Sequence, residues 1–276
     1  MHFRRTIGLA VLSSIGLMSS PALAQVSAPA QPEAQEEQKD LPKASDVFDR
    51  HIEAIGGIDA IKSIDSRRLS GRIKVYVAGE EEPRLTGILR LAAQAPDKII
   101  QEIIFPGRST QKRVFDGKAG WLIEDESEPR ALVGEELERF VVSSRFYAEA
   151  DYETHFKSIE TVDVQETPQG RVIMVRVDHH SGRAEAYLFS EESGLLVAVA
   201  GQRQTPQGQA LQFQRTYEEY TEYDGVKTSK LIKELAGGQI IELEFSSVEN
   251  NISDFPAIER PGNILDADIS AFQKSE

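Results

Sequence analysis

Three groups of residues in this sequence have types that catalysis or metal binding uses. The first is Asp178-His179-His180, where two histidines are neighbours in the chain. Neighbouring residues of a strand point to opposite faces, so two such imidazoles chelate one ion poorly, and no third ligand follows at a metal-site spacing. We therefore expect a solvated hairpin end here, and we predict no metal site in the chain.

The second group is His51-Ile52-Glu53, which resembles half of the zinc deaminase signature. The other half of that signature is Pro-Cys-x-x-Cys, and this chain contains no cysteine. We therefore expect His51 to be a partly buried helix residue. The absence of cysteine also excludes disulfides, thiol chemistry and an acylated N-terminal cysteine.

The third group, Glu218, Glu219 and Glu222, offers paired carboxylates for acid–base chemistry. Acidic residues are frequent throughout the chain, however, and a solvated strand face is the better explanation of these three. Neither G-x-S-x-G nor H-E-x-x-H occurs. We predict no catalytic residue, no cofactor and a protein that is not an enzyme.

The glycine pair Gly56-Gly57 raises the question of a phosphate-binding loop. Such a loop follows a strand and needs G-x-G-x-x-G or G-x-x-x-x-G-K-[ST], neither of which is present. Apolar residues recur instead at helical spacing over 46–55, with Ser45 as N-cap, and a second helical turn covers 58–64. Glycine is the expected residue just past a helix end, so the pair separates two helices and is predicted to act as a hinge.

After residue 66 the apolar period changes from helical to alternating, which predicts strands. Asp116-Gly117 is a strong hairpin turn signal, and a helical stripe at 134–147 interrupts the run. Short connections predict an antiparallel meander with one apolar and one solvated face. About eleven strands are expected, over 69–77, 85–91, 98–105, 110–115, 121–123, 172–177, 184–189, 195–202, 209–216, 228–235 and 239–248.

The N-terminal residues predict export. Arg4 and Arg5 precede an apolar run over 7–18, and Ala22-Leu23-Ala24 supplies a cleavage site, so residues 1–24 are predicted to be a signal peptide cleaved after Ala24. Removing them changes the formal net charge from −14 to −16, which disfavours nucleic acid as a partner. No further apolar run is long enough to predict an integral membrane span.

The rest of the chain divides by composition into three parts. Residues 25–42 are rich in Gln, Pro, Ala and Glu and are predicted to form a disordered acidic linker. Residues 43–260 are long enough for a single domain with one sizeable core. Residues 261–276 are expected to form a loosely attached C-terminal tail.

Several segments between residues 44 and 257 carry a family resemblance: AIGGIDAIKSI, RRLSGRIKV, PDKIIQEIIFPG, VFDGKAGW, RAEAYLFSEESGLLVAV, TEYDGVKTSKLI and VENNISDFP. They resemble the bacterial outer-membrane lipoprotein-sorting-like proteins, which are periplasmic and have a LolA/LolB-like fold. The resemblance implies an α+β, mainly β fold in which a strongly curved antiparallel sheet forms an open half-barrel and helices plug its concave side. It also implies a concave apolar surface suited to an acyl chain or a lipidated partner.

Alternating apolar residues on neighbouring strands make this concave face the predicted ligand-lining surface. Trp121, the only tryptophan, is either a core residue or part of the lining. The predicted function is a periplasmic carrier that holds a lipid or lipoprotein acyl chains, linked to outer-membrane biogenesis. The alternative is an envelope scaffold or sensor that binds a protein partner, with the concavity filled by its own helices. The predicted lining residues are Leu69, Ile73, Val75, Leu85, Leu89, Leu91, Ile99, Ile103, Phe105 and Trp121.

Overall fold

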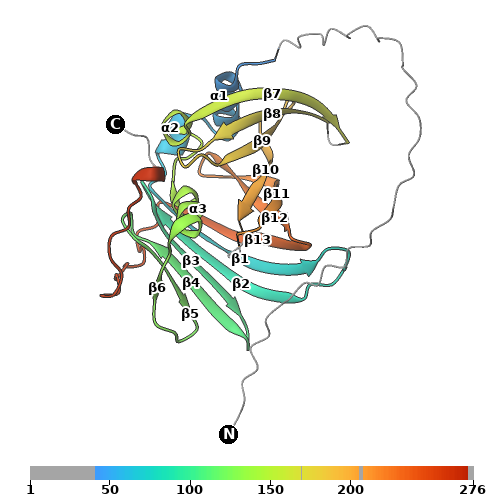
Figure 1. The fold of residues 1–276 in the computed structure, drawn as a ribbon. Coiled ribbons are helices and arrows are strands. Elements are labelled where there is room, and N and C mark those ends of the chain that lie inside the picture. Colours follow the sequence, from blue (N-terminus) through green and yellow to red (C-terminus); the bar gives the residue numbers. More distant parts are fainter. Residues whose placement is uncertain (1–40, 169, 205–207, 273–276) are drawn as a thin grey trace, which may run out of the picture. The chain divides into compact units, whose positions relative to one another are not determined.

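The structure, a computed structural model, describes residues 41–168, 170–204 and 208–272, all within one compact unit. The predicted signal peptide and nearly all of the predicted linker lie outside the described residues. The described chain forms one antiparallel sheet of thirteen strands that is not closed into a barrel (Figure 1). The strands are β1 (Ser66–Val77), β2 (Leu85–Gln94), β3 (Lys98–Phe105), β4 (Ser109–Phe115), β5 (Gly120–Glu124), β6 (Arg130–Ala131), β7 (Ser158–Thr167), β8 (Gly170–Asp178), β9 (Ala184–Ser190), β10 (Leu196–Gln204), β11 (Ala210–Tyr223), β12 (Val226–Ala236) and β13 (Gln239–Asn250).

The sheet consists of two meanders that meet in its middle. Strands β1 to β6 follow one another outward to one edge, and β13 back to β7 follow one another outward to the other edge. The first and last strands, β1 and β13, pair along the seam from Arg67–Asn250 to Val77–Gln239. The predicted mainly-β, open antiparallel sheet is thereby confirmed.

Two strands were not expected from the sequence. Strand β6 has only two residues, too few to show a period. Strand β7 is an edge strand, and a bulge between Thr161 and Asp163 shifts its register. A bulge moves the side chains that follow it to the other face of the sheet. Ile159 and Val164 therefore share one face although they are five positions apart, and the sequence of β7 shows no regular alternation of apolar and polar residues.

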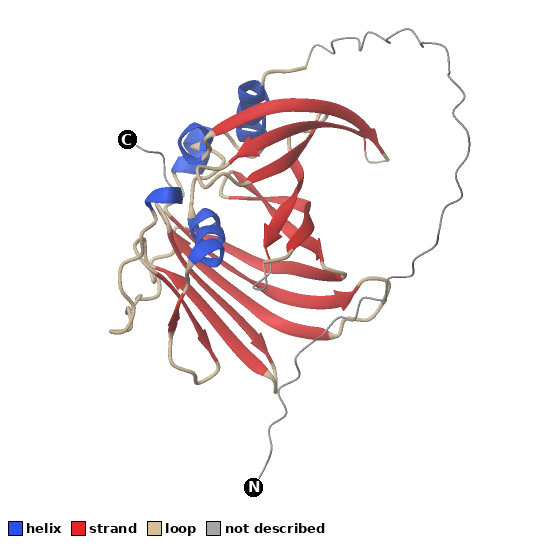
Figure 2. Ribbon diagram, viewed as in Figure 1, coloured by secondary structure: helices blue, strands red, loops and turns tan. Residues whose placement is uncertain are grey.

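Short helices make up the remaining regular structure (Figure 2). They are α1 (Ala44–Ala54), α2 (Ile58–Lys62), α3 (Gly134–Ser144), α4 (Tyr152–His155) and the 3₁₀ turn η1 (Ser270–Phe272). The N-cap of α1 is Lys43 and not Ser45, whose hydroxyl bonds Asp46 inside the first turn. Helix α3 ends at Ser144, three residues before the expected end. No helix in the described ranges is long and apolar enough to span a bilayer.

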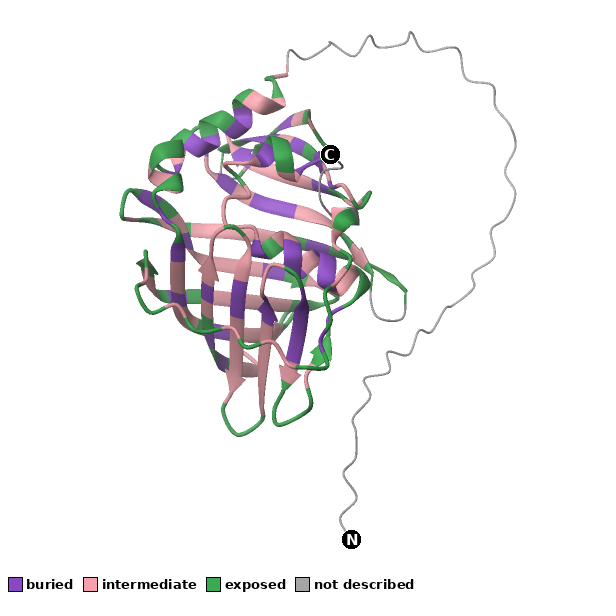
Figure 3. Ribbon diagram, turned by 90° about the vertical axis from the view of Figure 1, so that its left-hand side faces the viewer, coloured by how far each residue is buried: buried purple, intermediate pink, exposed green. Residues whose placement is uncertain are grey.

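Helices α1 and α3 pack on the same face of the sheet, which we call the inner face. Val47, Phe48 and Ile52 of α1 pack on strands β7 to β11, where Val175 and Phe189 are fully buried. At the other end of the sheet, α3 packs on β3, β4 and β5 through an apolar cluster. Figure 3 shows buried residues as bands across the strands, while the turns at the strand ends are exposed. The members of the α3 cluster are Ile99, Phe115, Leu122, Leu132, Leu137, Phe140 and Val141.

The opposite, outer face is covered at β3, β4 and β5 by the C-terminal segment. Phe255, Ile258 and Ile264 pack on this face, and the Arg260 guanidinium bonds Asp116 at 2.7 Å. The chain then reaches the inner face, where Ala267, Ile269 and Phe272 pack against the α3 cluster. As far as Phe272, the segment expected as a loose tail is therefore part of the packed domain.

Candidate binding site on the inner sheet face

Nine of the ten predicted lining residues lie on the inner face. The register pairs Leu69 with Leu91, Val75 with Leu85, and Leu89 with Ile103. Directly paired residues share a face, and residues two apart along a strand do too. By the same alternation, Ile73 of β1 and Ile99 and Phe105 of β3 also lie on the inner face. Their role in holding a ligand stays a prediction.

Trp121 lies on the outer face. It pairs with Val114, which pairs with Ile100, whereas Ile99 points to the inner side beneath α3. Its ring is buried, with 2% exposed, together with Ile100, Val114 and Ile264. Of the two interpretations of Trp121, core and lining, the structure favours core.

The inner face between the two helix-covered regions carries a set of half-buried apolar side chains, which we call the inner patch. Its floor is buried and consists of Leu69, Ile73, Leu89 and Phe245. No residue of a described helix belongs to this cluster. The patch itself consists of Val75, Leu85, Leu91, Ile103, Phe105, Ile232, Ile241 and Leu243.

Beside the inner patch, strands β10 to β12 carry a charged group on the same face. Glu234 accepts hydrogen bonds from Arg203 and Arg215, each at 2.6 Å. Although burial acts in the opposite direction, the two guanidinium groups hold the pKa of Glu234 below its usual value. Each charge in this group therefore has a partner, as buried charges require.

A second buried charged network ties α3 to the β8–β9 hairpin. Glu138 of α3 accepts hydrogen bonds from Ser181 and Arg183, and Arg183 also pairs with Glu185. Glu185 in turn contacts the His179 ring nitrogen Nε2 at 3.0 Å. His179 is buried, with its ring against that of Phe156, so the expectation of a solvated hairpin end is wrong for this residue.

No group of three potential ligands that could hold a metal ion occurs among the residues that the structure describes. His51 is fully buried in α1, and its Nδ1 lies 3.1 Å from the Gly194 carbonyl oxygen. It helps to dock α1 on the turn before β10.

We expect His155 to make the stability of the domain sensitive to acid. Burial, with the nearby Arg145 charge acting in the same direction, lowers the pKa of His155 to about 4. The unfolded side chain takes up a proton near pH 6.5, so between these values the unfolded state binds more protons and stability rises with pH. The contribution of His155 to the free energy of unfolding is therefore complete above pH 6.5 and is lost as the pH falls towards 4.

We therefore expect acidification from pH 7.5 to 4.5 to remove about 1–2 kcal/mol through this half-buried residue, a figure reduced for its solvent exposure. His155→Gln removes the titrating group, so between pH 7.5 and 4.5 this variant should lose less free energy of unfolding than the parent protein, by the amount that His155 contributes. Urea unfolding of both proteins at the two pH values measures the difference. Equal losses would show that His155 does not titrate in this way.

Gly56 lies in tight backbone contact with the β11–β12 turn. The Ile55 carbonyl accepts a hydrogen bond from the Lys227 backbone N–H at 2.8 Å. A Cβ atom added to Gly56 would lie 2.1 Å from the Gly225 carbonyl oxygen. Gly56 and Gly57 separate α1 from α2 as expected, while a hinge motion at this pair stays a prediction.

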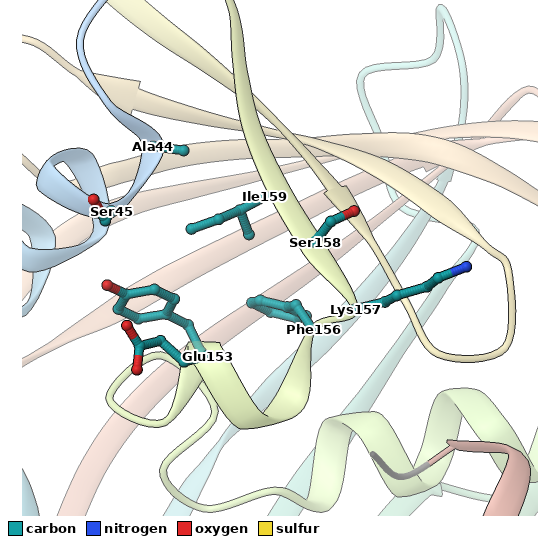
Figure 4. Close-up of a pocket in the computed structure, with 8 residues that line it drawn as sticks. Ala44, Ser45, Glu153, Phe156, Lys157, Ser158 and Ile159 are labelled. Atoms are coloured by element: carbon teal, nitrogen blue, oxygen red, sulfur yellow. The ribbon is translucent and has the colours of Figure 1, made fainter. Parts of the chain in front are cut away.

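A separate small groove lies beside the start of edge strand β7. Its volume is about 380 Å³, and α1 contributes Ala44 and Ser45 to its wall. Figure 4 shows these two residues on one side and Ser158 on the other, with the Lys157 ammonium pointing away. No predicted site residue lines it. The remaining lining residues are Tyr152, Glu153, Phe156 and Ile159.

Comparisons with known proteins support the fold. The structure is similar to that of a LolA superfamily protein from Nitrosomonas europaea, with a TM-score of 0.54 and 12% identity over 78% of this chain and 98% of that chain. The chain has a LolA-like fold. A DUF1329 family protein from Desulfovibrio piger matches the LolA-like domain equally well, with a TM-score of 0.54 and 10% identity over 77% and 95% of the two chains.

A third similar structure is a putative outer membrane lipoprotein-sorting protein domain from Vibrio parahaemolyticus. Its TM-score to this LolA-like chain is 0.48, with 13% identity over 75% of this chain and 97% of that chain. No family model matches the sequence, and no curated protein matches it. The likeness therefore concerns the fold.

One inner-face residue with an unusual environment was missed in the sequence. Arg113 of β4 pairs with Gln101 and Leu122, and so lies on the inner face beneath α3. Its Nε atom is buried without a hydrogen-bond partner. Lys112 precedes it, and two adjacent basic residues give no sign of which one points inward.

Proposed function

We propose that this protein is a non-enzymatic binding or carrier protein of the bacterial periplasm that holds acyl chains of a lipid or lipoprotein on the inner patch. The single observation that carries the proposal is the patch itself, a row of half-buried apolar side chains on the inner face above a buried cluster that contains no residue of a described helix. The predicted signal peptide and the LolA-like fold support the compartment and a link to outer-membrane biogenesis.

The driving force of binding would be the removal of an acyl chain from water. Each buried methylene contributes about 0.8 kcal/mol, so a chain that lies along the patch gains several kcal/mol before ordering is subtracted. Contiguous exposed apolar surface on a protein commonly marks a binding site. The buried floor of Leu69, Leu89 and Phe245 would keep that surface in place.

Two adjacent residues of β3 test the patch. Ile103 and Ile104 are both half-buried, but Ile103 faces the inner patch and Ile104 pairs with Ile88 on the outer face. We expect Ile103→Gln to weaken binding of a long-chain acyl probe about tenfold or more, since it places an amide on the binding surface. Ile104→Gln should bind like the parent protein.

The measurement is titration of delipidated protein with a fluorescent acyl probe, after unfolding curves have shown that both variants remain folded. Equal affinities for the two variants would contradict the proposed site. Native mass spectrometry of protein purified from the periplasm without detergent would identify the bound acyl class.

A second candidate function is binding of a protein partner at the sheet edge. It is favoured by the groove of about 380 Å³ beside the start of β7, because β7 is the last strand of the sheet that the described residues form. Edge strands accept an added strand in several recognition modes. Absence of acyl-probe uptake together with a co-purifying protein would support this candidate.

A further inference from the structure

Arg113 is an unpaired cation on the inner face. It takes part in no ion pair and no side-chain hydrogen bond among the residues that the structure describes, and its Nε is fully covered. Burial lowers the pKa of Arg113, and the negative charge of Glu136 counteracts this only in part. A guanidinium whose Nε is covered and unbonded is unfavourable, so a ligand anion that pairs with the rest of the group would supply a partner that the fold leaves out.

The acidic residues around Arg113 are already engaged. Glu136 accepts two hydrogen bonds from Arg130, at 2.8 and 3.0 Å. Glu135 lies 3.5 Å from Arg139 and accepts the Gln204 backbone N–H, and Glu124 accepts a hydrogen bond from Gln111. These contacts leave Arg113 as the guanidinium of this cluster without a carboxylate of its own.

Arg113 lies at one end of the inner patch. Gln101 is its partner on β3, and Ile103 is the next inner-face residue on that strand. From there the patch continues over Leu89 to Leu85 and Val75. Along β2 the inner-face residues from Leu91 to Leu85 span about 20 Å at the usual rise per residue. One leaflet of a bilayer core measures about 15 Å, so the patch can hold one extended acyl chain.

We propose that the inner patch binds a long-chain fatty acid whose carboxylate pairs with Arg113 while its chain lies over Ile103, Leu89 and Leu85. One unpaired guanidinium fits one monoanionic head, because its planar fork matches a carboxylate and its neighbours Arg130 and Arg139 are already paired. This inference rests on the proposed function and specifies the ligand class.

The test compares hexadecanoate with hexadecanol, which has the same chain and no charge. Both are titrated into the delipidated mature protein purified from the periplasm, as competitors of a fluorescent acyl probe. Arg113→Gln should weaken hexadecanoate binding about tenfold or more, since a charge-assisted pair is lost, and should leave hexadecanol binding unchanged. Arg113→Lys keeps the positive charge but lacks the planar guanidinium fork, so its hexadecanoate affinity should lie between those of the parent protein and Arg113→Gln.

The matched control is Arg90→Gln. Arg90 lies on β2 with its side chain on the outer face, where it pairs with Glu102 at 3.0 Å. This variant should bind both ligands like the parent protein. Unfolding curves show whether each Arg113 variant is folded. If Arg113→Gln fails to fold, the hexadecanoate and hexadecanol affinities of Arg113→Lys are compared with those of the parent protein instead.

The outcomes separate this inference from the proposed function. If hexadecanoate and hexadecanol bind equally in parent and Arg113→Gln proteins, the patch is an acyl site and the role of Arg113 is refuted. If neither ligand binds the parent protein, the proposed function itself fails. If only palmitoyl-lysophosphatidylglycerol depends on Arg113, the anion is a lipid phosphate and the fatty acid is refuted.

Discussion

Replacing Phe48 by alanine is expected to lower the free energy of unfolding by about 3–5 kcal/mol, as truncation of a fully buried aromatic residue usually does. The Phe48 ring has no exposed surface and is the centre of an aromatic cluster. It stacks on Tyr152 at 4.7 Å between ring centroids and meets Phe189 edge-on at 5.1 Å. Phe48 thus joins α1, α4 and β9, and its loss leaves a cavity between all three.

Phe48→Leu separates the loss of volume from the loss of aromatic contacts. Leucine retains most of the volume, so this variant should lose about 1–2 kcal/mol. Urea denaturation followed by far-UV circular dichroism gives the free energy of unfolding for the parent and both variants. A loss below about 1 kcal/mol for Phe48→Ala would mean that α1 is not docked on the sheet as described.

The second large effect is expected at the end of α1. Gly56→Ala should lower the free energy of unfolding by about 4 kcal/mol, for two reasons. Gly56 has φ +133°, a conformation that costs a non-glycine residue about 1–3 kcal/mol. The new Cβ would also lie 2.1 Å from the Gly225 carbonyl oxygen, so one backbone must move, which typically costs another 1–3 kcal/mol.

Gly79→Ala is the matched control for the first of these reasons. Gly79 has φ +91° in the β1–β2 turn, but an added Cβ would meet no atom within 4 Å. It should therefore lose only the conformational part, about 1–2 kcal/mol. If thermal unfolding places both variants at the same midpoint, the close approach of Gly56 to Gly225 does not exist in solution, and a hinge at Gly56 becomes compatible with the packing.

The sequence predicts most strands because one face of the sheet is buried. Along β1, the inner residues Leu69, Ile73 and Val75 alternate with polar ones, so the period of two is visible. The prediction fails where this contrast is absent. Edge strand β7 has little apolar surface to bury, and its bulge at Thr161 changes the phase.

The candidate site is only partly visible in the sequence. In Trp121-Leu122-Ile123 three successive residues are apolar because the C-terminal segment covers the outer face and α3 covers the inner one. A run without alternation does not reveal which face each residue takes, so Trp121 could not be assigned. Arg113 is a similar case, since its burial depends on α3, which comes later in the chain.

The pairing of β1 with β13 has a consequence for how the domain forms. Arg67 and Asn250 are partners at the centre of the sheet although 183 positions separate them in the chain. Such a topology has high contact order, and high contact order slows folding because loop-closure entropy is lost before the contact forms. Until β13 has formed, β1 has no partner on its seam side and the two halves of the sheet remain separate. A chain that is truncated before Gln239 would therefore expose the edge of β1 to aggregation and proteolysis.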